Sequence, residues 1–388
     1  MRKSKIGCVI AYTKGHNNYG TSLQGYAMLK KIQQLGYEVE VIKYIKRLST
    51  WQKIKFVVNA LRAGEWKNIQ HRLTSKQMLK KYPVYAAGIA ERTTAVNAYK
   101  QKKLIPLFHE YIGYDALHKG SLNYAAVVVG SDQVWTPMSL PNKFFNLLFV
   151  SDSVRKVAYA SSFGVSEIPS FQRKATGAYL DRFYKIGVRE QRGKEIVEEL
   201  SHQKATVVAD PTMLLSREEW EQEIADAHTT TEELYIFCYF LGTNQEARKA
   251  AKELKEKTGY KIITIRHMDE YVPEDELFGD EAPYNVDPND FVKYISRAAY
   301  VCTDSFHCTV FSILFHRQFM TFYRFAEGSK TGRNSRINSL FDLFELQERL
   351  YKGDINKITN PIDYNSVDEK LSELRKESIY FLNECLAF

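Results

Sequence analysis

The sequence predicts an α/β protein with two doubly wound parallel sheets that face each other across a cleft. Short β-branched strands alternate with helical stretches, which is the pattern of right-handed crossovers between parallel strands. The alternation occurs twice, on either side of a polar segment at 216–233. A chain of 388 residues also suits two domains better than one. We therefore expect a first domain at 1–215, a linker at 216–233 and a second domain at 234–388.

The first domain is expected to open with a buried strand from Lys5 to Tyr12, a helix at 21–35 that ends near Gly36, and a strand from Glu38 to Tyr44. A helical stretch follows around 90–112. The strands then resume at 127–130, 157–164, 185–190 and 205–211. These elements are enough for one parallel sheet with helical connections.

The second domain repeats this pattern. The expected strands are 234–242, 261–266, 300–305 and 319–324. The expected helices are 244–258, closed by Gly259, one from Asp287 with Pro288 in its first turn, one from about 307, and an amphipathic helix at 366–384.

The composition excludes several classes of protein. Hydrophobic residues make up 44% and charged residues 26%, so the chain is neither disordered nor a low-complexity scaffold. No apolar run reaches the roughly 18 residues that span a bilayer, and we expect the basic start to lead into a strand and not a signal peptide. Five scattered cysteines without a C-x-x-C pair favour a reduced, cytoplasmic enzyme. Cys302, His307 and Cys308 lack a fourth ligand, so no metal is expected.

Positive charge is concentrated in one segment. Residues 41–90 contain eleven Lys or Arg and a single acid, Glu65. Apolar and aromatic residues recur between Trp51 and Trp66 at helical spacing, which predicts a basic amphipathic helix over 51–81. Such a helix suits an anionic membrane surface, at the inner face of the membrane, or a lipid-pyrophosphate-linked substrate. A helix packed on its own domain with a solvated basic face explains the pattern too. We expect no nucleic-acid partner because no RNA- or DNA-binding motif is present.

Polar residues follow the strands of the first domain, and ligands of such sheets bind outside the carboxyl ends of the strands. The turn before the first helix contains Asn17, Tyr19, Gly20, Thr21 and Ser22, which suits an anion or a sugar hydroxyl, although a helix cap explains it equally well. Further candidates at strand ends are Ser131, Asp132, Gln133, Ser161 and Ser162. Arg189 ends the strand at 185–190, where its guanidinium can bind a carboxylate or phosphate, or pair with Glu190 or Asp210.

The most informative motif is TDSFHCTVFSILF at 303–315. A strand ends in Asp304 and Ser305, and His307 then opens an apolar helix that also contains Thr309. Backbone N–H groups and the helix dipole favour an anion there, and His307 can transfer a proton near neutral pH. The segment 324–344 adds Arg324, Lys330, Arg333 and Arg336, which suggests a loop that grips phosphate. Neither a dinucleotide-binding fingerprint nor a P-loop is present.

Seven motifs in order, NNYGTSLQGYAML, VVVGSDQVWTP, AYASSFG, GVRE, ADPTMLL, TDSFHCTVFSILF and SRINSLF, resemble the polysaccharide pyruvyl transferase family from about residue 6 to 350. The resemblance implies a GT-B-like fold of two Rossmann-like domains. It also implies transfer of the enolpyruvyl group of phosphoenolpyruvate onto two hydroxyls of a sugar, which gives a cyclic ketal and phosphate. The acceptors of such enzymes are cell-surface polysaccharide precursors, as for capsule or exopolysaccharide, and are often lipid-linked.

The resemblance also implies roles for individual residues. Arg189 and His307 match an arginine and a histidine of the family's donor site, whereas Ser305 stands where the family pattern has arginine. We expect Arg336 or Arg324 to supply the missing charge, on a donor side formed by 234–388 and opposite an acceptor side formed by 1–215.

Ketal formation requires a general acid, for which His307 is the candidate. Asp132 or Asp304 is expected to take the proton of the attacking hydroxyl, or Asp304 to orient His307. This chemistry needs no metal or redox cofactor. Two other functions fit the sequence: a GT-B nucleotide-sugar glycosyltransferase, and a non-catalytic sugar-binding or scaffold protein of a polymer assembly complex.

Overall fold

The computed structural model describes residues 4–12, 18–46, 78–229, 231–268, 271–324 and 334–388. Residues 51–77 of the predicted basic helix, the candidate Asn17 and residues 325–333 of the predicted phosphate-gripping loop lie outside these ranges. Among the described helices, none combines the length and the apolar character needed to cross a membrane.

The first sheet contains seven parallel strands within the described residues, in the order β3-β2-β1-β4-β5-β6-β7. The strands are β1 (Lys5–Val9), β2 (Glu38–Ile45), β3 (Phe108–Ile112), β4 (Ala126–Asp132), β5 (Arg155–Ser161), β6 (Lys185–Val188) and β7 (Ala205–Val207). The order reverses between β1 and β4, which pair with each other in the middle of the sheet. In a doubly wound sheet the binding crevice lies at such a switch point, so the residues after β1 and β4 border it.

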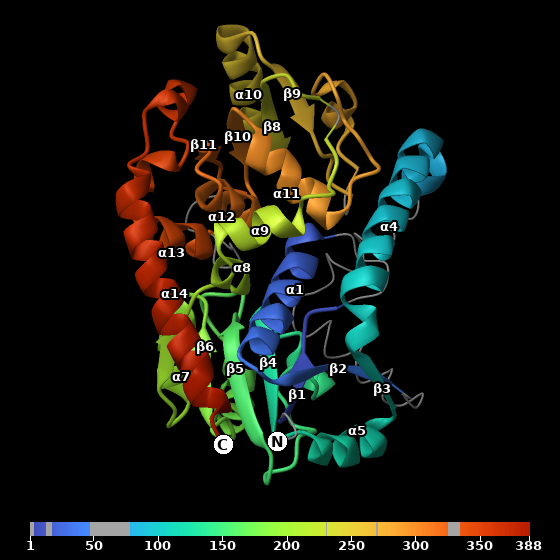
Figure 1. The fold of residues 1–388 in the computed structure, drawn as a ribbon, viewed down its shortest axis with the longest axis vertical. Helices are drawn as coiled ribbons and strands as arrows, with labels where there is room; N and C mark the ends of the chain where they lie inside the picture. The colour runs from blue at the N-terminus through green and yellow to red at the C-terminus, as the bar shows by residue number, and fades with distance from the viewer. Residues whose placement is uncertain (1–3, 13–17, 47–77, 230, 269–270, 325–333) are drawn as a thin grey trace.

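The second sheet contains four parallel strands in the described part of the chain, in the order β11-β10-β8-β9. They are β8 (Tyr235–Tyr239), β9 (Lys261–Thr264), β10 (Tyr300–Thr303) and β11 (Gln318–Thr321). Here the order reverses between β8 and β10. The two sheets confirm the predicted fold class, which is two Rossmann-like α/β domains in a GT-B-like arrangement (Figure 1).

Helices cover both sheets. The α-helices of the first half and of the connection are α1 (Tyr19–Gln34), α4 (Pro83–Lys103), α5 (Tyr114–Gly120), α6 (Ser170–Leu180), α7 (Gln191–Leu200), α8 (Pro211–Leu214) and α9 (Arg217–Glu223). Those of the second half are α10 (Gln245–Thr258), α11 (Pro288–Arg297), α12 (Phe306–Leu314), α13 (Ser335–Phe344) and α14 (Tyr364–Leu386). Short 3₁₀ helices occur at Ile105–Leu107, Ser121–Asn123, Leu140–Asn142, Pro273–Leu277, Gln347–Arg349 and Ile355–Thr359.

The alternation of side chains along β4 divides the first domain into two cores. Val128 packs into the core that contains Leu23 and Ala27 of α1. Val127 and Val129 point to the opposite face and pack into the core that α5, α6 and α7 cover. The α1 core continues into the second domain, so the two domains share one apolar cluster.

One predicted element is wrong. The helical stretch expected around 90–112 is the helix α4, and Phe108–Ile112 forms the edge strand β3, in register with Val41–Ile45 of β2. Pro106 has no backbone N–H for a helix, and the run that follows is aromatic and β-branched. The helix therefore ends before the proline and a strand begins after it.

The polar segment at 216–233 connects the two sheets and contains the helix α9. Its first turn is closed by a capping box in which Ser216 and Glu219 satisfy each other's backbone N–H groups. Trp220 is fully buried and donates from Nε1 to the carbonyl of Thr212 at 2.9 Å. Its ring also packs on Phe311 of α12, with centroids 5.0 Å apart. The segment is therefore a packed joint between the domains.

The helix α14 also joins the domains, because it starts beside the second sheet and ends against the first (Figure 1). Near its start, Tyr364 donates to the carbonyl of Arg317. Farther along, the backbone N–H of Ala209 donates to Ser378 Oγ at 2.8 Å, and Arg155 donates to the carbonyl of Cys385 at 3.1 Å.

Candidate functional site

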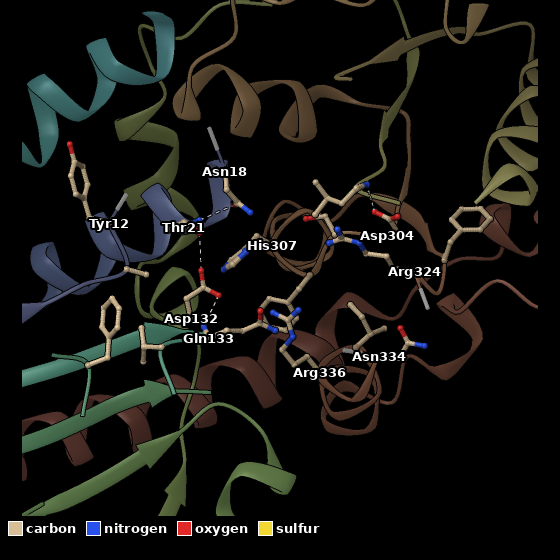
Figure 2. Close-up of a pocket in the computed structure, with 18 residues that line it drawn as sticks. Tyr12, Asn18, Thr21, Asp132, Gln133, Asp304, His307, Arg324, Asn334 and Arg336 are labelled. Atoms are coloured by element: carbon tan, nitrogen blue, oxygen red, sulfur yellow. Dashed lines mark hydrogen bonds between the residues drawn. The ribbon is translucent and has the colours of Figure 1, made fainter. Parts of the chain in front are cut away.

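A cavity of about 370 Å³ lies between the carboxyl ends of the two sheets (Figure 2). Its polar lining from the first domain is Tyr12, Asn18, Thr21, Asp132 and Gln133. Its polar lining from the second domain is Asp304, Ser305, His307, Arg324, Asn334 and Arg336. The first wall carries the carboxylate of Asp132 and hydroxyls, and the second carries two guanidinium groups, the carboxylate of Asp304 and the start of α12.

His307 lies in the first turn of α12, where the two domains meet. Ser305 caps this helix, and its Oγ accepts from the N–H of Cys308 at 3.4 Å. The imidazole is about 10% exposed, and its Nε2 lies 3.6 Å from Oδ2 of Asp210. On the opposite edge of the ring, a Cβ on Gly20 would lie only 2.0 Å from Nδ1. The predicted Gly20 is therefore required here by close contact, and it leaves room for the His307 ring.

Asp132 ends β4 in the left-handed region, with φ of 73°. Its Oδ2 accepts from Thr21 Oγ1 at 2.8 Å, and its Oδ1 accepts from the N–H of Gln133 at 2.9 Å.

Burial would raise the pKa of Asp132, but Arg189, His307 and Arg336 outweigh burial and hold this pKa below its usual value. Asp132 therefore places an ionised carboxylate in the cavity wall at neutral pH.

Arg189 lies behind the cavity wall and not in it. Its side chain is 2% exposed, and Nη1 donates to Oδ2 of Asp210 at 3.0 Å. Nη2 lies 3.8 Å from Oδ1 of Asp132, and the guanidinium lies over the ring of Phe306, 4.9 Å from its centroid. The structure shows the ion pair with Asp210 that the sequence left as an alternative to substrate binding. Arg189 thus neutralises the carboxylates that border the cavity.

Asp304 lines the cavity but does not orient His307. Its Oδ1 accepts from the N–H of Leu241 at 2.6 Å, and its Oδ2 accepts from the N–H of Gly242 at 2.8 Å. Burial raises the pKa of Asp304 above its usual value, while these two backbone N–H groups act in the opposite direction. Asp304 fixes the turn after β8, and the carboxylate next to His307 Nε2 is Asp210.

Sequence reasoning did not select Asp210 as a site residue. The signal was the motif ADPT at 209–212, shortly after β7, which an ordinary turn explains as well. Asp210 is indeed the N-cap of α8, where its Oδ1 accepts from both the N–H and the hydroxyl of Thr212, at 3.0 and 2.7 Å. Burial would raise the pKa of Asp210, but His307 and Arg189 hold it well below its usual value.

Among the remaining candidates of the second domain, Ser305, Arg324 and Arg336 line the cavity. The guanidinium of Arg336 lies 5.6 Å from the centroid of the Phe306 ring. Thr309 lies in the core instead, where its hydroxyl donates to the carbonyl of Ser305 at 3.0 Å. Ser305 and the two arginines therefore remain candidates for substrate contact, and Thr309 does not line the cavity.

Several candidates of the first domain support the site from outside the cavity. Tyr19 stacks on Phe291 of α11, with centroids 4.6 Å apart, and so joins α1 to the second domain. Ser131 Oγ accepts from the N–H of Asp132 at 2.6 Å, and Ser162 donates to Glu190 Oε1 at 2.5 Å. Ser22 and Ser161 are buried as well.

The polar lining residues that sequence reasoning did not select are Tyr12, Asn18 and Asn334, whereas Thr21 belongs to the predicted turn motif. Asn18 caps α1, and its Oδ1 accepts from the N–H of Thr21 at 3.2 Å. Asn18 lies inside the same turn motif, between Asn17 and Tyr19, so the motif could have indicated it as well. In the part of the chain that the structure describes, no three His, Cys, Asp or Glu side chains are grouped so as to hold a metal ion.

Two Rossmann-like domains that share one polar cavity form a GT-B-like architecture. The model of the polysaccharide pyruvyl transferase family matches residues 18–324, which is most of the chain. The chain therefore belongs to this family, and it is a transferase of polysaccharide biosynthesis.

The chain matches no curated protein sequence. Solved structures similar to it include UDP-GlcNAc 2-epimerase from Neisseria meningitidis bound to UDP-GlcNAc, with 8% identity, a TM-score of 0.46, and coverage of 97% of this chain and 100% of that one. The S. aureus MnaA–UDP co-structure has 10% identity and a TM-score of 0.47, and the match covers 98% of this chain and 97% of that one. Arabidopsis thaliana UGT89C1 complexed with UDP-L-rhamnose has 10% identity and a TM-score of 0.45, with coverage of 98% and 100%.

Proposed function

We propose that the chain transfers the enolpyruvyl group of phosphoenolpyruvate onto two hydroxyls of a sugar in a polysaccharide precursor, forming a cyclic ketal and releasing phosphate. The observation that carries the proposal is the difference between the two walls of the cavity. Arg324, Arg336 and the start of α12 with His307 form one wall, and the carboxylate of Asp132 lies on the other. Asp304 also lies on the first wall, but its oxygens accept from two backbone N–H groups.

The cationic wall suits the donor. Phosphoenolpyruvate carries a carboxylate and a phosphate, and both groups form strong, charge-assisted hydrogen bonds with guanidinium groups. The first turn of α12 adds backbone N–H groups and the positive end of the helix dipole. The proposed donor side is therefore the second domain, with Arg324 and Arg336 in place of the arginine that the family pattern has at Ser305.

The reaction needs one general acid, and the proton that this acid gives up is returned by one of the sugar hydroxyls. His307 protonates the methylene carbon of the donor, and the cation that forms at the neighbouring carbon is attacked by the first sugar hydroxyl. Phosphate then leaves, and the second hydroxyl attacks the same carbon. Of the two hydroxyl protons, one leaves with phosphate and the other restores His307. These steps are acid–base and addition chemistry and need no metal or redox cofactor.

Asp132 suits the acceptor side. Because its pKa is lowered, its carboxylate is a weak base and acts first as a hydrogen-bond acceptor that aims a sugar hydroxyl at the donor. We propose that this sugar is lipid-linked and that the enzyme acts at the inner, cytoplasmic face of the membrane. The support is the charge of residues 41–90, with eleven Lys or Arg and one acid, which suits an anionic surface.

The test is to incubate the purified full chain with phosphoenolpyruvate and a panel of polyprenyl-pyrophosphate-linked saccharides. Mass spectrometry should detect a saccharide that has gained a pyruvate ketal, and free phosphate should appear in equal amount. His307→Ala should lower phosphate release by about 10²–10⁴-fold, which is the usual contribution of a general acid. Binding of phosphoenolpyruvate, measured by calorimetry, should persist in this variant.

His316→Ala is the matched control, because His316 lies on the same domain, pairs with Asp368 and does not line the cavity. This variant should keep the wild-type rate. Near-normal turnover by His307→Ala would contradict the mechanism. Binding of UDP-sugars without binding of phosphoenolpyruvate would support the nucleotide-sugar glycosyltransferase instead, and absence of turnover with every donor would support the scaffold protein.

A further inference from the structure

We propose that Asp210 is a positioning residue that keeps a proton on Nε2 of His307 and thereby leaves Nδ1 to exchange a proton with the substrate. The inference deepens the proposed function, since it rests on His307 acting as the general acid. A neutral imidazole carries its proton on one nitrogen only, and the partner of that nitrogen decides which one it is.

The two oxygens of Asp210 have separate partners. Oδ1 accepts from the N–H and the hydroxyl of Thr212, at 3.0 and 2.7 Å, so its direction is fixed. Oδ2 accepts from Arg189 Nη1 at 3.0 Å and from Ser131 Oγ at 3.5 Å, and it lies 3.6 Å from Nε2 of His307. The side chain of Asp210 is 0% exposed, so water does not compete with the imidazole for this oxygen. A buried carboxylate beside Nε2 favours the ring form that has a proton there.

The opposite edge of the ring lies at the start of α1. Gly20 has no side chain, and a Cβ there would lie 2.0 Å from Nδ1. Asn18 and Thr21, on either side of Gly20, both line the cavity. The absent side chain thus makes room for the Nδ1 edge beside residues that line the cavity, while Nε2 is turned toward Asp210.

The variant Asp210→Asn separates this role from a structural one. The two donors of Thr212 hold the amide oxygen in the place of Oδ1, so the amide NH₂ takes the place of Oδ2 and the hydrogen bond from Arg189 Nη1 is lost. It then offers a donor to Nε2, which favours the opposite form of the ring, with the proton on Nδ1. The helix cap at α8 is retained, because Asn caps helices as well as Asp does.

The first measurement is ¹⁵N NMR of the histidine-labelled full chain without ligand, above the pH at which the imidazoles lose their charge. In the wild type, Nε2 of His307 should be protonated and Nδ1 should not. In Asp210→Asn the two assignments should exchange. Asp368→Asn is the matched control, because Asp368 Oδ1 lies 2.9 Å from Nε2 of the surface residue His316. This variant should change the signals of His316 and leave those of His307 unaltered.

The second measurement is a double-mutant cycle of phosphate release. Asp210→Asn should lower kcat by about 10²–10⁴-fold with little change in KM for phosphoenolpyruvate. In the His307→Gln background, the same substitution should cause no further loss, because Asp210 acts through His307. If Asp210 had a merely structural role, Asp210→Asn would lower kcat by the same factor in the wild-type and the His307→Gln backgrounds.

The proposal is overturned if Nε2 of His307 stays protonated in Asp210→Asn. It is also overturned if the losses of kcat caused by the Asp210 and the His307 substitutions multiply in the double variant. The NMR measurement needs no substrate. A wild-type chain that releases no phosphate from phosphoenolpyruvate would therefore overturn the proposed function, while the form of the His307 ring would still decide the role of Asp210.

Discussion

At the scale of single residues, two positions of the cavity are constrained by backbone geometry as well as by chemistry. Gly20 must lack a side chain because Nδ1 of His307 occupies the space where a Cβ would lie. Asp132 has φ of 73°, a conformation that costs a residue with a side chain about 1–3 kcal/mol. Its hydrogen bonds with Thr21 and Gln133 hold this conformation. Strain of this kind is concentrated at functional sites.

Gly20→Ala should lower turnover without unfolding the chain. The new methyl group would displace the His307 ring, and we expect a loss in kcat of at least about tenfold, since a displaced general acid gives up part of its usual 10²–10⁴-fold contribution. Alanine itself favours a helix over glycine by about 1 kcal/mol. The measurement is kcat for phosphate release together with the melting temperature.

Gly25→Ala is the control on the same helix. Its nearest neighbour would be Cδ1 of Ile10 at 3.3 Å, the flexible end of a side chain, so activity should persist. Equal activity of the two variants would show that the contact between Gly20 and His307 is irrelevant to catalysis.

The pattern of strand ends and helix starts led to about the right residues, but it did not show which way each side chain faces. Arg189 ends β6 as expected, yet it faces Asp210 and not the cavity. The carboxylate beside His307 belongs to Asp210, on a different domain and far away in the sequence. Such pairings depend on how the domains are placed against each other, which local sequence patterns do not contain.

At the scale of elements, the starts of α12 and α13 form the cationic wall. The ring of Phe306, in the first turn of α12, contacts two arginines with different roles. Arg189 is buried and paired with Asp210, whereas Arg336, in the first turn of α13, lines the cavity. The start of α12 was predicted correctly to within one residue because a strand end, a serine cap and an apolar run follow one another.

Arg336→Ala should weaken the binding of phosphoenolpyruvate by about 10–100-fold, because hydrogen bonds to charged groups contribute about 1.5–3 kcal/mol. Calorimetry at constant ionic strength measures the change in Kd. Arg297→Ala is the control with the same change in net charge, since Arg297 is 45% exposed on α11 and pairs with Glu232. If both variants bind as the wild type does, Arg336 makes no contact with the donor.

The missed strand β3 shows where element prediction fails. Phe108–Ile112 is short and lies directly behind a helix, so periodicity alone extends the helix through it. Its structure depends on pairing with β2, whose residues lie more than sixty positions earlier in the sequence. Strands at the centre of the sheet, such as β4, were predicted because their apolar runs are buried on both faces.

At the scale of the whole molecule, polar contacts fasten the domains together around the cavity. Glu223 of α9 accepts from Tyr26 of α1, from Lys103 of α4 at 2.5 Å and from Asn289 of α11 at 3.3 Å. Arg92 of α4 donates to the carbonyl of Tyr284 in the second domain at 2.7 Å. Composition and alternation predicted two α/β domains, whereas these contacts arise only from their packing, and the domain limits at 1–215 and 234–388 stay a prediction.

Glu223→Gln should destabilise the chain by about 1–3 kcal/mol, since it removes one member of a largely buried ion pair. Burial would raise the pKa of Glu223, but Lys103 and Tyr26 hold it below its usual value. Because the folded pKa lies below the unfolded value of about 4.3, the stabilisation is present above that pH and is lost as the pH falls through the folded pKa. The difference between wild type and variant should therefore shrink from pH 7 toward acid.

Urea unfolding at several pH values measures this difference. Glu221→Gln on the same helix is the control, because Glu221 is 51% exposed and pairs only with the neighbouring Arg217 in the described contacts. Its substitution should change the free energy of unfolding by less than about 0.5 kcal/mol at any pH. If both substitutions changed the free energy of unfolding equally, the loss would come from the change in net charge and not from the contacts of Glu223 between the domains.

The helix α14 limits how the enzyme can open. It is continuous from Tyr364 to Leu386 and is tied to the second domain at one end and to the first at the other. A helix keeps its length, so it acts as a strut that prevents the two domains from separating along its side of the molecule. Figure 1 shows α4 on the opposite side. Because Arg92 of α4 donates to the carbonyl of Tyr284 in the second domain, the α4 side resists opening as well, and the two helices together hold the domains at a fixed separation around the cavity.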